Sequence, residues 1–208
     1  MSTDQDTVRS YDATAAQYAA EAAAMPEWVA TEIDAFVTAL GGVGRVLEIG
    51  SGGGRDARVL EQRGISVRCT DVSKGFVELL RKAGFEADLL DPLNDDLTDP
   101  QRPGTPYDGV WACASLIHVA RQDFGTVLRR IAEATRGGGR LHASVRDGDG
   151  EDLSTRGSAT APRRYTETYW REPALRSAVT VAGWLVNDVR RYIGRPDDPW
   201  LSIRATRP

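Results

Sequence analysis

A glycine-rich turn between an apolar run and a helical segment constrains this sequence more than any other feature. Residues 46–50 read Val-Leu-Glu-Ile-Gly, and glycine also occupies positions 52, 53 and 54. Glycines let the backbone approach a ligand closely, and a helix that begins after them directs its unpaired N–H groups toward the same space. A second apolar run, residues 65–70, leads to Asp71, an acid placed to bind ribose hydroxyls. This order predicts a nucleoside-binding βαβ unit.

The spacing of the glycines limits the kinds of nucleoside ligand that the loop could bind. In the dinucleotide fingerprint, G-x-G-x-x-G, the third glycine would fall at position 55, which is Arg55. Residues 48–54 read acid-x-G-x-G-x-G instead, and this pattern resembles motif I of the class I S-adenosylmethionine (SAM) dependent methyltransferases. Residues 111–119, Trp-Ala-Cys-Ala-Ser-Leu-Ile-His-Val, and residues 167–206 resemble small bacterial enzymes of this family, so the resemblance covers nearly the whole chain.

Length and composition suit one cytoplasmic α/β domain. The chain has 208 residues, of which 41% are hydrophobic and 27% charged. The net charge of −4 argues against nucleic acid as the main substrate, because a phosphate backbone calls for a basic surface. The polar start and the lack of a long apolar run predict no membrane association. Cys69 and Cys113 lie in apolar runs and are expected to be buried thiols, and no metal site is predicted.

Alternating strands and helices predict a parallel sheet with helices on both faces. The family resemblance implies a Rossmann-like three-layer αβα sandwich with a seven-stranded sheet in the order 3-2-1-4-5-7-6, strand seven antiparallel, and an N-terminal helical cap over residues 1–40. Residues 184–192 and 200–205 are expected to pair as the terminal hairpin. Residues 146–164 are polar and predicted to be a mobile lid or insertion. A helix is predicted over 167–182, bent or delayed by Pro173.

The methyl donor is expected beyond the carboxyl ends of the strands, near the switch in strand order. By the family pattern, SAM would bind there and leave as S-adenosylhomocysteine (SAH). Asp71 would bind the ribose and Val72 would pack on the adenine, whereas Asp88 or Asp91 would either accept from the adenine amino group or be an acid of a turn. Arg55 would either reach the SAM carboxylate or be a solvated arginine at a helix start. The full set of expected cofactor-binding residues is Glu48, Gly50, Ser51, Gly52, Arg55, Asp71, Val72, Asp88, Leu89 and Cys113.

His118 follows the fourth predicted strand, where the methyl group should lie. Because imidazole titrates near neutral pH, it could take a proton from a substrate hydroxyl or amine. The alternative is a histidine that shapes the pocket or hydrogen-bonds nearby backbone. Methyl transfer from a sulfonium can proceed largely by positioning and desolvation, so a base is not required. The other histidine, His142, is expected to be a packed core residue.

The acceptor pocket is expected to be covered by the variable segments. Tyr11 and Tyr18 resemble the Tyr-Asp-x-x-Ala-x-x-Tyr helix that closes over SAM in many relatives, and Tyr18 is the expected contact and second catalytic residue. Arginines beside aromatic residues after the predicted lid would suit a planar or carboxylate-bearing small molecule. The expected substrate residues are Trp28, His118, Arg163, Arg164, Tyr165 and Tyr169.

These features predict a methyltransferase that acts on an oxygen or nitrogen of a small molecule by in-line displacement, as a monomer or homodimer. One alternative is an RNA or protein methyltransferase, which would need a basic or open groove. Another is a SAM-binding protein that catalyses a non-methylating reaction such as cyclisation. The Asn/Asp-Pro-Pro-Tyr type motif of nucleic-acid amino methylating enzymes is replaced here by Cys-Ala-Ser-Leu at residues 113–116.

Overall fold

The computed structural model describes residues 5–158, 161–194 and 198–208 of the chain. The described helices are α1 (Gln5–Glu21), α2 (Glu27–Leu40), α3 (Arg55–Gln62), α4 (Lys74–Lys82), α5 (Arg121–Ala134) and α6 (Glu172–Val181), with a short 3₁₀ helix η1 (Leu116–His118). The described strands are β1 (Gly44–Ile49), β2 (Ile65–Asp71), β3 (Ala87–Leu89), β4 (Tyr107–Ala112), β5 (Thr135–Asp147), β6 (Glu151–Ser158), β7 (Ala161–Trp170), β8 (Leu185–Ile193) and β9 (Pro199–Thr206).

The main sheet has the predicted topology. Strands β3, β2, β1, β4 and β5 are parallel neighbours in that order. Strand β9 then pairs antiparallel with β5, and β8 pairs antiparallel with β9. Since β8 and β9 are the sixth and seventh strands of this sheet, its order is 3-2-1-4-5-7-6 with the seventh strand antiparallel, and the predicted fold class is confirmed.

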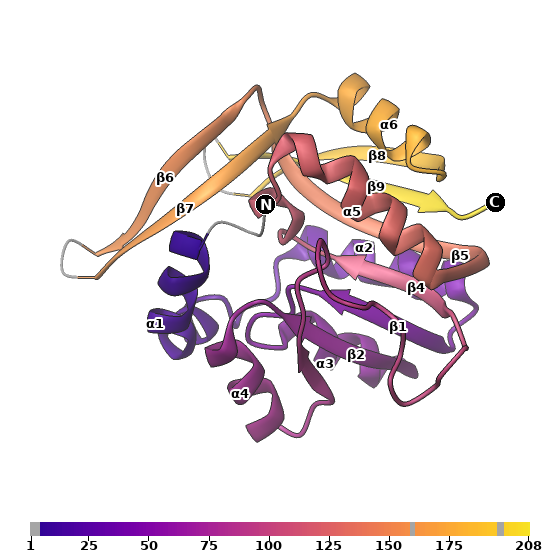
Figure 1. The fold of residues 1–208 in the computed structure, drawn as a ribbon, viewed down its shortest axis with the longest axis horizontal. Coiled ribbons are helices and arrows are strands. Elements are labelled where there is room, and N and C mark those ends of the chain that lie inside the picture. Colours follow the sequence, from indigo (N-terminus) through magenta and orange to yellow (C-terminus); the bar gives the residue numbers. More distant parts are fainter. Residues whose placement is uncertain (1–4, 159–160, 195–197) are drawn as a thin grey trace.

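Helices cover both faces of the sheet, as Figure 1 shows, with α2, α3 and α4 on one face and α5 and α6 on the other. The central strands are buried on both sides, so successive residues of β1 enter different cores. Val46 belongs to the core that contains Phe36 of α2, whereas Leu47 belongs to the core that contains Leu128 of α5. Burying each such side chain stabilises the fold by about 1.5–3 kcal/mol relative to exposure. Because the strands β1 to β5 are parallel, their carboxyl ends lie at the same edge of the sheet.

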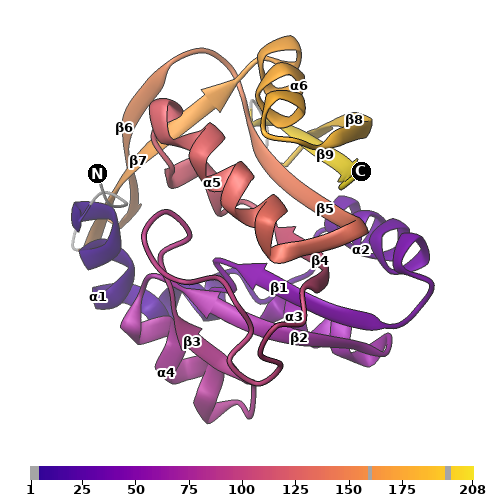
Figure 2. The same ribbon diagram turned by 45° about the vertical axis from the view of Figure 1, so that its right-hand side comes forward.

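Strands β6 and β7 form an antiparallel hairpin that lies outside the seven-stranded order. The hairpin runs from the pair Glu151 and Thr168 to the pair Ser158 and Ala161, and the end of β7 pairs with the end of β5. Figure 2 shows the hairpin reaching past the sheet to α1. Of the segment predicted to be a mobile lid or insertion, 146–164, residues 146–147 end β5, and residues 151–158 and 161–164 lie in β6 and β7. These strands were not predicted, because two polar strands can pair with each other without an apolar signal on both faces.

The helix predicted over 167–182 has the delayed start that was one of the two expected effects of Pro173. Residues 167–170 belong to β7, and α6 begins at Glu172 with Pro173 in its first turn. Proline suits that position because the first N–H groups of a helix have no intrahelical partner. Residues 5–10 form the first turns of α1, and α1 packs on α4 and β7.

Candidate functional site

A cavity of about 830 Å³ opens at the carboxyl ends of β1, β2 and β4. We call residues 48–56 with Asp71 and Val72 the floor of this cavity, and α1 with Tyr165 and Glu167 of β7 its roof. Members of both sets line the cavity. Its volume lies in the range of sites that bury a cofactor-sized ligand.

The glycine loop of the floor is held by close backbone contacts. Gly50, Gly52 and Gly54 have φ angles of 72°, 54° and 77°, a left-handed conformation that favours glycine. A Cβ on Gly50 would lie 2.3 Å from Ser115 Cβ, and one on Gly53 would lie 2.7 Å from Ala19 Cβ. The loop therefore packs tightly between the segment after β4 and the end of α1, and larger residues at these two positions would force the loop or its neighbours to shift.

Three N–H groups of this loop donate hydrogen bonds within the protein. Those of Gly50 and Ser51 each donate to the carbonyl oxygen of Thr70 at 2.9 Å, and that of Gly52 donates to Asp71 Oδ2 at 3.0 Å. In this structure these three N–H groups are therefore directed to acceptors of the protein. At its glycines the loop presents backbone rather than side chains to the cavity.

Glu48 is a buried carboxylate at the cavity wall. Its side chain is 2% exposed, and among the described residues its Oε2 has no hydrogen-bond partner. Burial, followed by the charge of Asp56, raises the pKa of Glu48 to about 8. Such a group would be stabilised in its ionised form by a cationic ligand in the cavity.

Asp71 ends β2 and is fixed by backbone donors. Its Oδ2 accepts from Gly52 and its Oδ1 accepts from the N–H of Ser73 at 2.9 Å. Each carboxylate oxygen can accept a second hydrogen bond, as a ribose diol would require. Burial raises the pKa of Asp71 to about 6 despite these donors. Val72 follows at the cavity wall, where a flat base could pack.

Arg55 is held at the cavity wall by a buried acid. Its Nε donates to Asp56 Oδ1 at 2.7 Å, and Asp56 Oδ2 accepts from Trp111 Nε1 at 3.0 Å. Arg55 is thus a half-buried, oriented arginine rather than the solvated arginine considered as an alternative. Cys113 lines the same wall, and burial raises the pKa of its thiol well above the usual value.

The segment after β4 leaves the sheet through a strained residue. Ala114 has φ 55° although it is not glycine, and its N–H donates to Ser144 Oγ at 2.8 Å. Strained backbone of this kind concentrates at functional sites. The turn leads into η1, whose last residue, His118, has Nε2 at 2.8 Å from Tyr11 Oη and Nδ1 at 2.9 Å from the carbonyl oxygen of Thr166.

The roof helix α1 docks on the start of α4. Asp12 Oδ1 accepts from Ser73 Oγ at 2.6 Å and from the N–H of Gly75 at 3.1 Å. A Cβ on Gly75 would lie only 2.9 Å from Ala15 Cβ, so the two helices touch there. Tyr11 and Tyr18 meet edge to face with ring centroids 5.4 Å apart, and both line the cavity. The Tyr-Asp-x-x-Ala-x-x-Tyr pattern therefore encodes docking through its acid and alanine and cavity lining through its tyrosines.

A buried arginine and aromatic rings form the side of the cavity beneath β8 and β9. The Arg146 guanidinium lies 4.1 Å from the Trp200 ring centroid and pairs with Asp198 and Glu167. Trp28, predicted to contact the substrate, lines this side of the cavity, and its ring centroid lies 6.2 Å from that of Trp200. The sequence analysis did not identify Arg146 or Glu167, because they come from β5 and β7 and only the tertiary fold brings them together.

The substrate residues predicted on the hairpin are divided by the structure. Tyr165 lines the cavity and stacks on Tyr11 with ring centroids 4.6 Å apart. Arg164 is exposed and points away, as expected for the next residue of a strand. Tyr169 lies outside the cavity lining and donates its hydroxyl to Glu167 Oε2 at 3.2 Å. The side chain of Arg163 lies outside the described residues.

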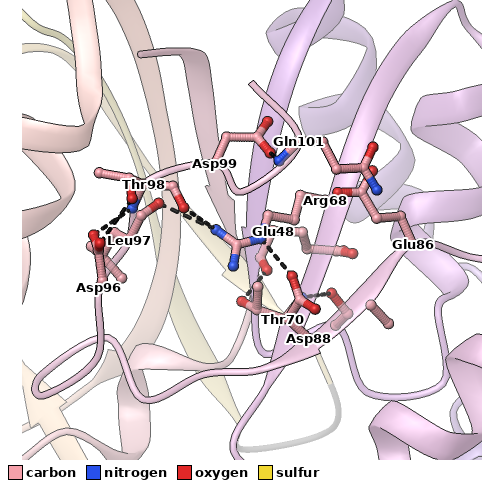
Figure 3. Close-up of polar contacts among 12 residues, drawn as sticks. Glu48, Arg68, Thr70, Glu86, Asp88, Asp96, Leu97, Thr98, Asp99 and Gln101 are labelled. Atoms are coloured by element: carbon pink, nitrogen blue, oxygen red, sulfur yellow. Dashed lines mark hydrogen bonds and ion pairs between the residues drawn. The ribbon is translucent and has the colours of Figure 1, made fainter. Parts of the chain in front are cut away.

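The structure does not place Asp88 and Leu89 in the cavity lining. Asp88 points toward Arg68 on the neighbouring strand (Figure 3), and its Oδ2 accepts from Arg68 Nε at 2.9 Å. Arg68 also donates to the carbonyl of Thr98 and to the hydroxyl of Tyr107, so this acid belongs to a network that anchors the loop between β3 and β4. Leu89 is 48% exposed. The structure therefore gives no support for a contact of either residue with the cofactor, and that assignment stays a prediction.

Two further sequence expectations can be compared with the structure. Asp91 accepts from the N–H of Leu93 and from the Asn94 amide, which makes it the acid of a turn. His142 is fully buried and stacks on Trp111 with ring centroids 3.8 Å apart, as expected of a core residue. Burial lowers the pKa of His142 to about 3. Within the described ranges, no helix combines the length and the apolar character that crossing a bilayer requires.

Comparison with known proteins gives a family match and similar folds. Residues 46–139 match the family described as a methyltransferase domain. A search of curated proteins gives no significant match. Among solved structures, the Burkholderia thailandensis 1,6-didemethyltoxoflavin-N1-methyltransferase, with bound 1,6-didemethyltoxoflavin and SAH, has a TM-score of 0.69 and 24% identity over 98% of this chain and 86% of that chain.

Two other similar structures have different activities in their names. Magnesium protoporphyrin IX methyltransferase from Synechocystis, with bound SAM, has a TM-score of 0.68 and 16% identity, over 98% of this chain and 97% of that chain. The cyclase SpnF has a TM-score of 0.70 and 16% identity, over 100% of this chain and 97% of that chain. At these identities the structures establish the shared fold and not a shared substrate.

Proposed function

We propose that this chain, whose residues 46–139 match a methyltransferase domain, is a class I SAM-dependent methyltransferase that methylates an oxygen or nitrogen of a small molecule. The observation that carries this proposal is the roof. Tyr11, Tyr165 and Glu167 line the same cavity as the glycine loop, and Tyr11 stacks on Tyr165, so an acceptor would have to fit between the roof and the floor. An RNA or a folded protein would need an open groove at this point. We further propose that the whole chain works as one domain, with residues 1–40 and the hairpin closing the site.

The floor fits SAM in charge and shape. SAM, when bound, supplies a methyl group on a positively charged sulfur. Glu48 carries a buried oxygen without a described partner, which suits a cationic ligand, and Asp71 presents two carboxylate oxygens for a ribose diol. Val72 would pack on the base, Arg55 would pair with the carboxylate end, and Ser51 and Cys113 would complete the wall.

The remaining residues would act on the acceptor by binding it and by excluding water. The aromatic rings of Trp28, Tyr18 and Tyr165 suit a planar acceptor, as rings in a dry pocket stack on flat molecules. Holding acceptor and donor in line converts the reaction into an intramolecular one, and effective molarities for well-oriented groups reach about 10⁵–10⁸ M. The cavity would therefore accelerate the reaction mainly by positioning the acceptor and the methyl donor.

The proposal is tested with methyl-tritiated SAM and a cell extract separated into small molecules, RNA and protein. We expect label in the small-molecule fraction and SAH as the sulfur product. Label only in RNA or protein would contradict the small-molecule assignment. A change of an extract compound that depends on the protein but consumes no SAM would instead identify a SAM-binding protein with another reaction, such as cyclisation.

A further inference from the structure

His118 has a defined neutral tautomer in this structure. Its Nδ1 lies 2.9 Å from the carbonyl oxygen of Thr166, and a carbonyl oxygen can only accept. In the neutral ring, Nδ1 therefore carries the proton and Nε2 carries the lone pair. Nε2 lies 2.8 Å from Tyr11 Oη, so the Tyr11 hydroxyl donates to it. The lone pair of His118 thus faces Tyr11 and not Tyr18.

Tyr11 is held rigidly in this position. Its ring stacks on Tyr165 and packs on Phe76, with centroid distances of 4.6 and 5.7 Å. The hairpin residue that accepts from His118 is itself attached to α1, since the N–H of Thr166 donates to Thr7 Oγ1 at 3.1 Å. Both partners of the imidazole therefore depend on the contact between α1 and β7, and both Tyr11 and His118 line the cavity.

We propose that Tyr11 and His118 form a proton relay that deprotonates the acceptor during methyl transfer. The acceptor's O–H or N–H bond breaks toward Tyr11 Oη while the Tyr11 proton moves to His118 Nε2. The acceptor atom forms its bond to the methyl carbon as the carbon–sulfur bond breaks and its electron pair stays on sulfur. The positive charge lost by the sulfonium reappears on the imidazolium, which donates to the carbonyl of Thr166.

This inference rests on the proposed function and narrows its substrate class. A relay is useful only for an acceptor that carries a proton when it binds, such as a phenol, an alcohol or a neutral N–H group. A carboxylic acid is already ionised near neutral pH and would need no relay. Glu167 follows Thr166 on β7 and lines the same cavity, where its carboxylate pairs with Arg146. Tyr11 would then be a catalytic residue and Tyr18 would only shape the pocket.

The first test is nitrogen–proton correlation NMR of the two imidazoles, with and without SAH. The chain has only two histidines, and His142 is buried elsewhere. At pH 8 we expect His118 as the Nδ1–H tautomer, and we expect Tyr11→Phe to shift its Nε2 resonance because one hydrogen bond is lost. Tyr18→Phe, the matched control, should leave that resonance unchanged. An Nε2–H tautomer, or the same spectrum for wild type and Tyr11→Phe, would overturn the relay.

The second test separates the relay from SAM binding. Calorimetry with SAH should give affinities for wild type and Tyr11→Phe within about threefold of each other, and absence of SAH binding to the wild type would contradict the proposed function while leaving the NMR result valid. With phenol and alcohol acceptors, Tyr11→Phe should lower kcat by about 10²-fold, in the range of general acid–base effects. It should also remove the fall of kcat at low pH. Equal kcat for both proteins, or transfer to carboxylic acids alone, would overturn the inference.

Discussion

The floor and the roof of the cavity are built in different ways. The floor comes from two short segments that are close in sequence, residues 48–56 and 71–72, and depends on backbone conformation and on carboxylates at strand ends. The roof brings together Tyr11 and Tyr165, which lie more than a hundred residues apart, and Tyr11 also contacts His118, all through side chains. A floor made of backbone can bind the same ligand in proteins with different side chains. A roof made of side chains can differ between proteins that act on different acceptors. Substitutions should therefore affect the two regions differently.

The largest effect is expected at the glycine loop. Gly50→Ala places a Cβ 2.3 Å from Ser115 Cβ and requires a left-handed alanine, so we expect the free energy of unfolding to fall by about 3 kcal/mol. Gly52→Ala is the matched control, because its φ of 54° is also left-handed but no atom lies within 4 Å of the added Cβ. It should lose about 1 kcal/mol. Equal losses in urea unfolding would show that the close contact with Ser115 is unimportant.

The second effect separates the two acids that end neighbouring strands. Asp71→Asn should weaken SAH binding by about 30-fold, since a charge-assisted acceptor of the ribose is worth about 1.5–3 kcal/mol. Asp88→Asn should leave SAH affinity unchanged, because Asp88 pairs with Arg68 outside the cavity. Calorimetry of both variants checks this. A comparable loss for Asp88→Asn would restore that acid to the cofactor site.

The third effect is a pH dependence carried by Glu48. Its folded pKa of about 8 lies above the ordinary carboxyl value, so the folded protein holds this proton more tightly than the unfolded chain. Stability should therefore fall as pH rises from about 4.5 to 8, by on the order of 1–3 kcal/mol. Glu48→Gln should reduce this slope and be more stable than wild type at pH 8, while binding SAM less tightly. Parallel unfolding curves against pH for the two proteins would contradict this.

The smallest effect is expected from loosening the roof. Asp12→Ala removes the acceptor for Ser73 and Gly75 and should free α1 from α4. Because the floor stays intact, SAH affinity should fall by less than about fivefold, or about 1 kcal/mol, while proteolysis within α1 becomes faster. A loss as large as that of Asp71→Asn would mean that the roof and the floor are not separable.

The same division explains how much of the site the sequence predicts. The glycine spacing, Glu48 and Asp71 are read from one short pattern, and the structure places all of them at one cavity. The orientation of Asp88 could not be predicted from the sequence. Successive side chains of a strand point to opposite faces, β3 has only three residues, and Asp88 points toward Arg68 rather than into the cavity. Arg146 and Glu167 give no local signal.

The roof also shows where residue patterns are insufficient for secondary structure. Residues 151–158 and 161–170 are polar strands that pair mainly with each other, so neither has the apolar alternation of a sheet with a buried face. Tyr11 and Tyr18 belong to one recognisable pattern, yet only the contact with His118 distinguishes their roles. The sequence thus predicts most of the individual residues that line the floor, and it predicts the roof only as a region.

The central claim is that this cavity binds SAM on its floor, and calorimetric titration of the wild-type protein with SAH at pH 8 tests it most directly. We expect one SAH per chain with a dissociation constant in the micromolar range, weakened about 30-fold in Asp71→Asn. Absence of binding at high micromolar SAH, or equal binding to wild type and Asp71→Asn, would contradict the claim.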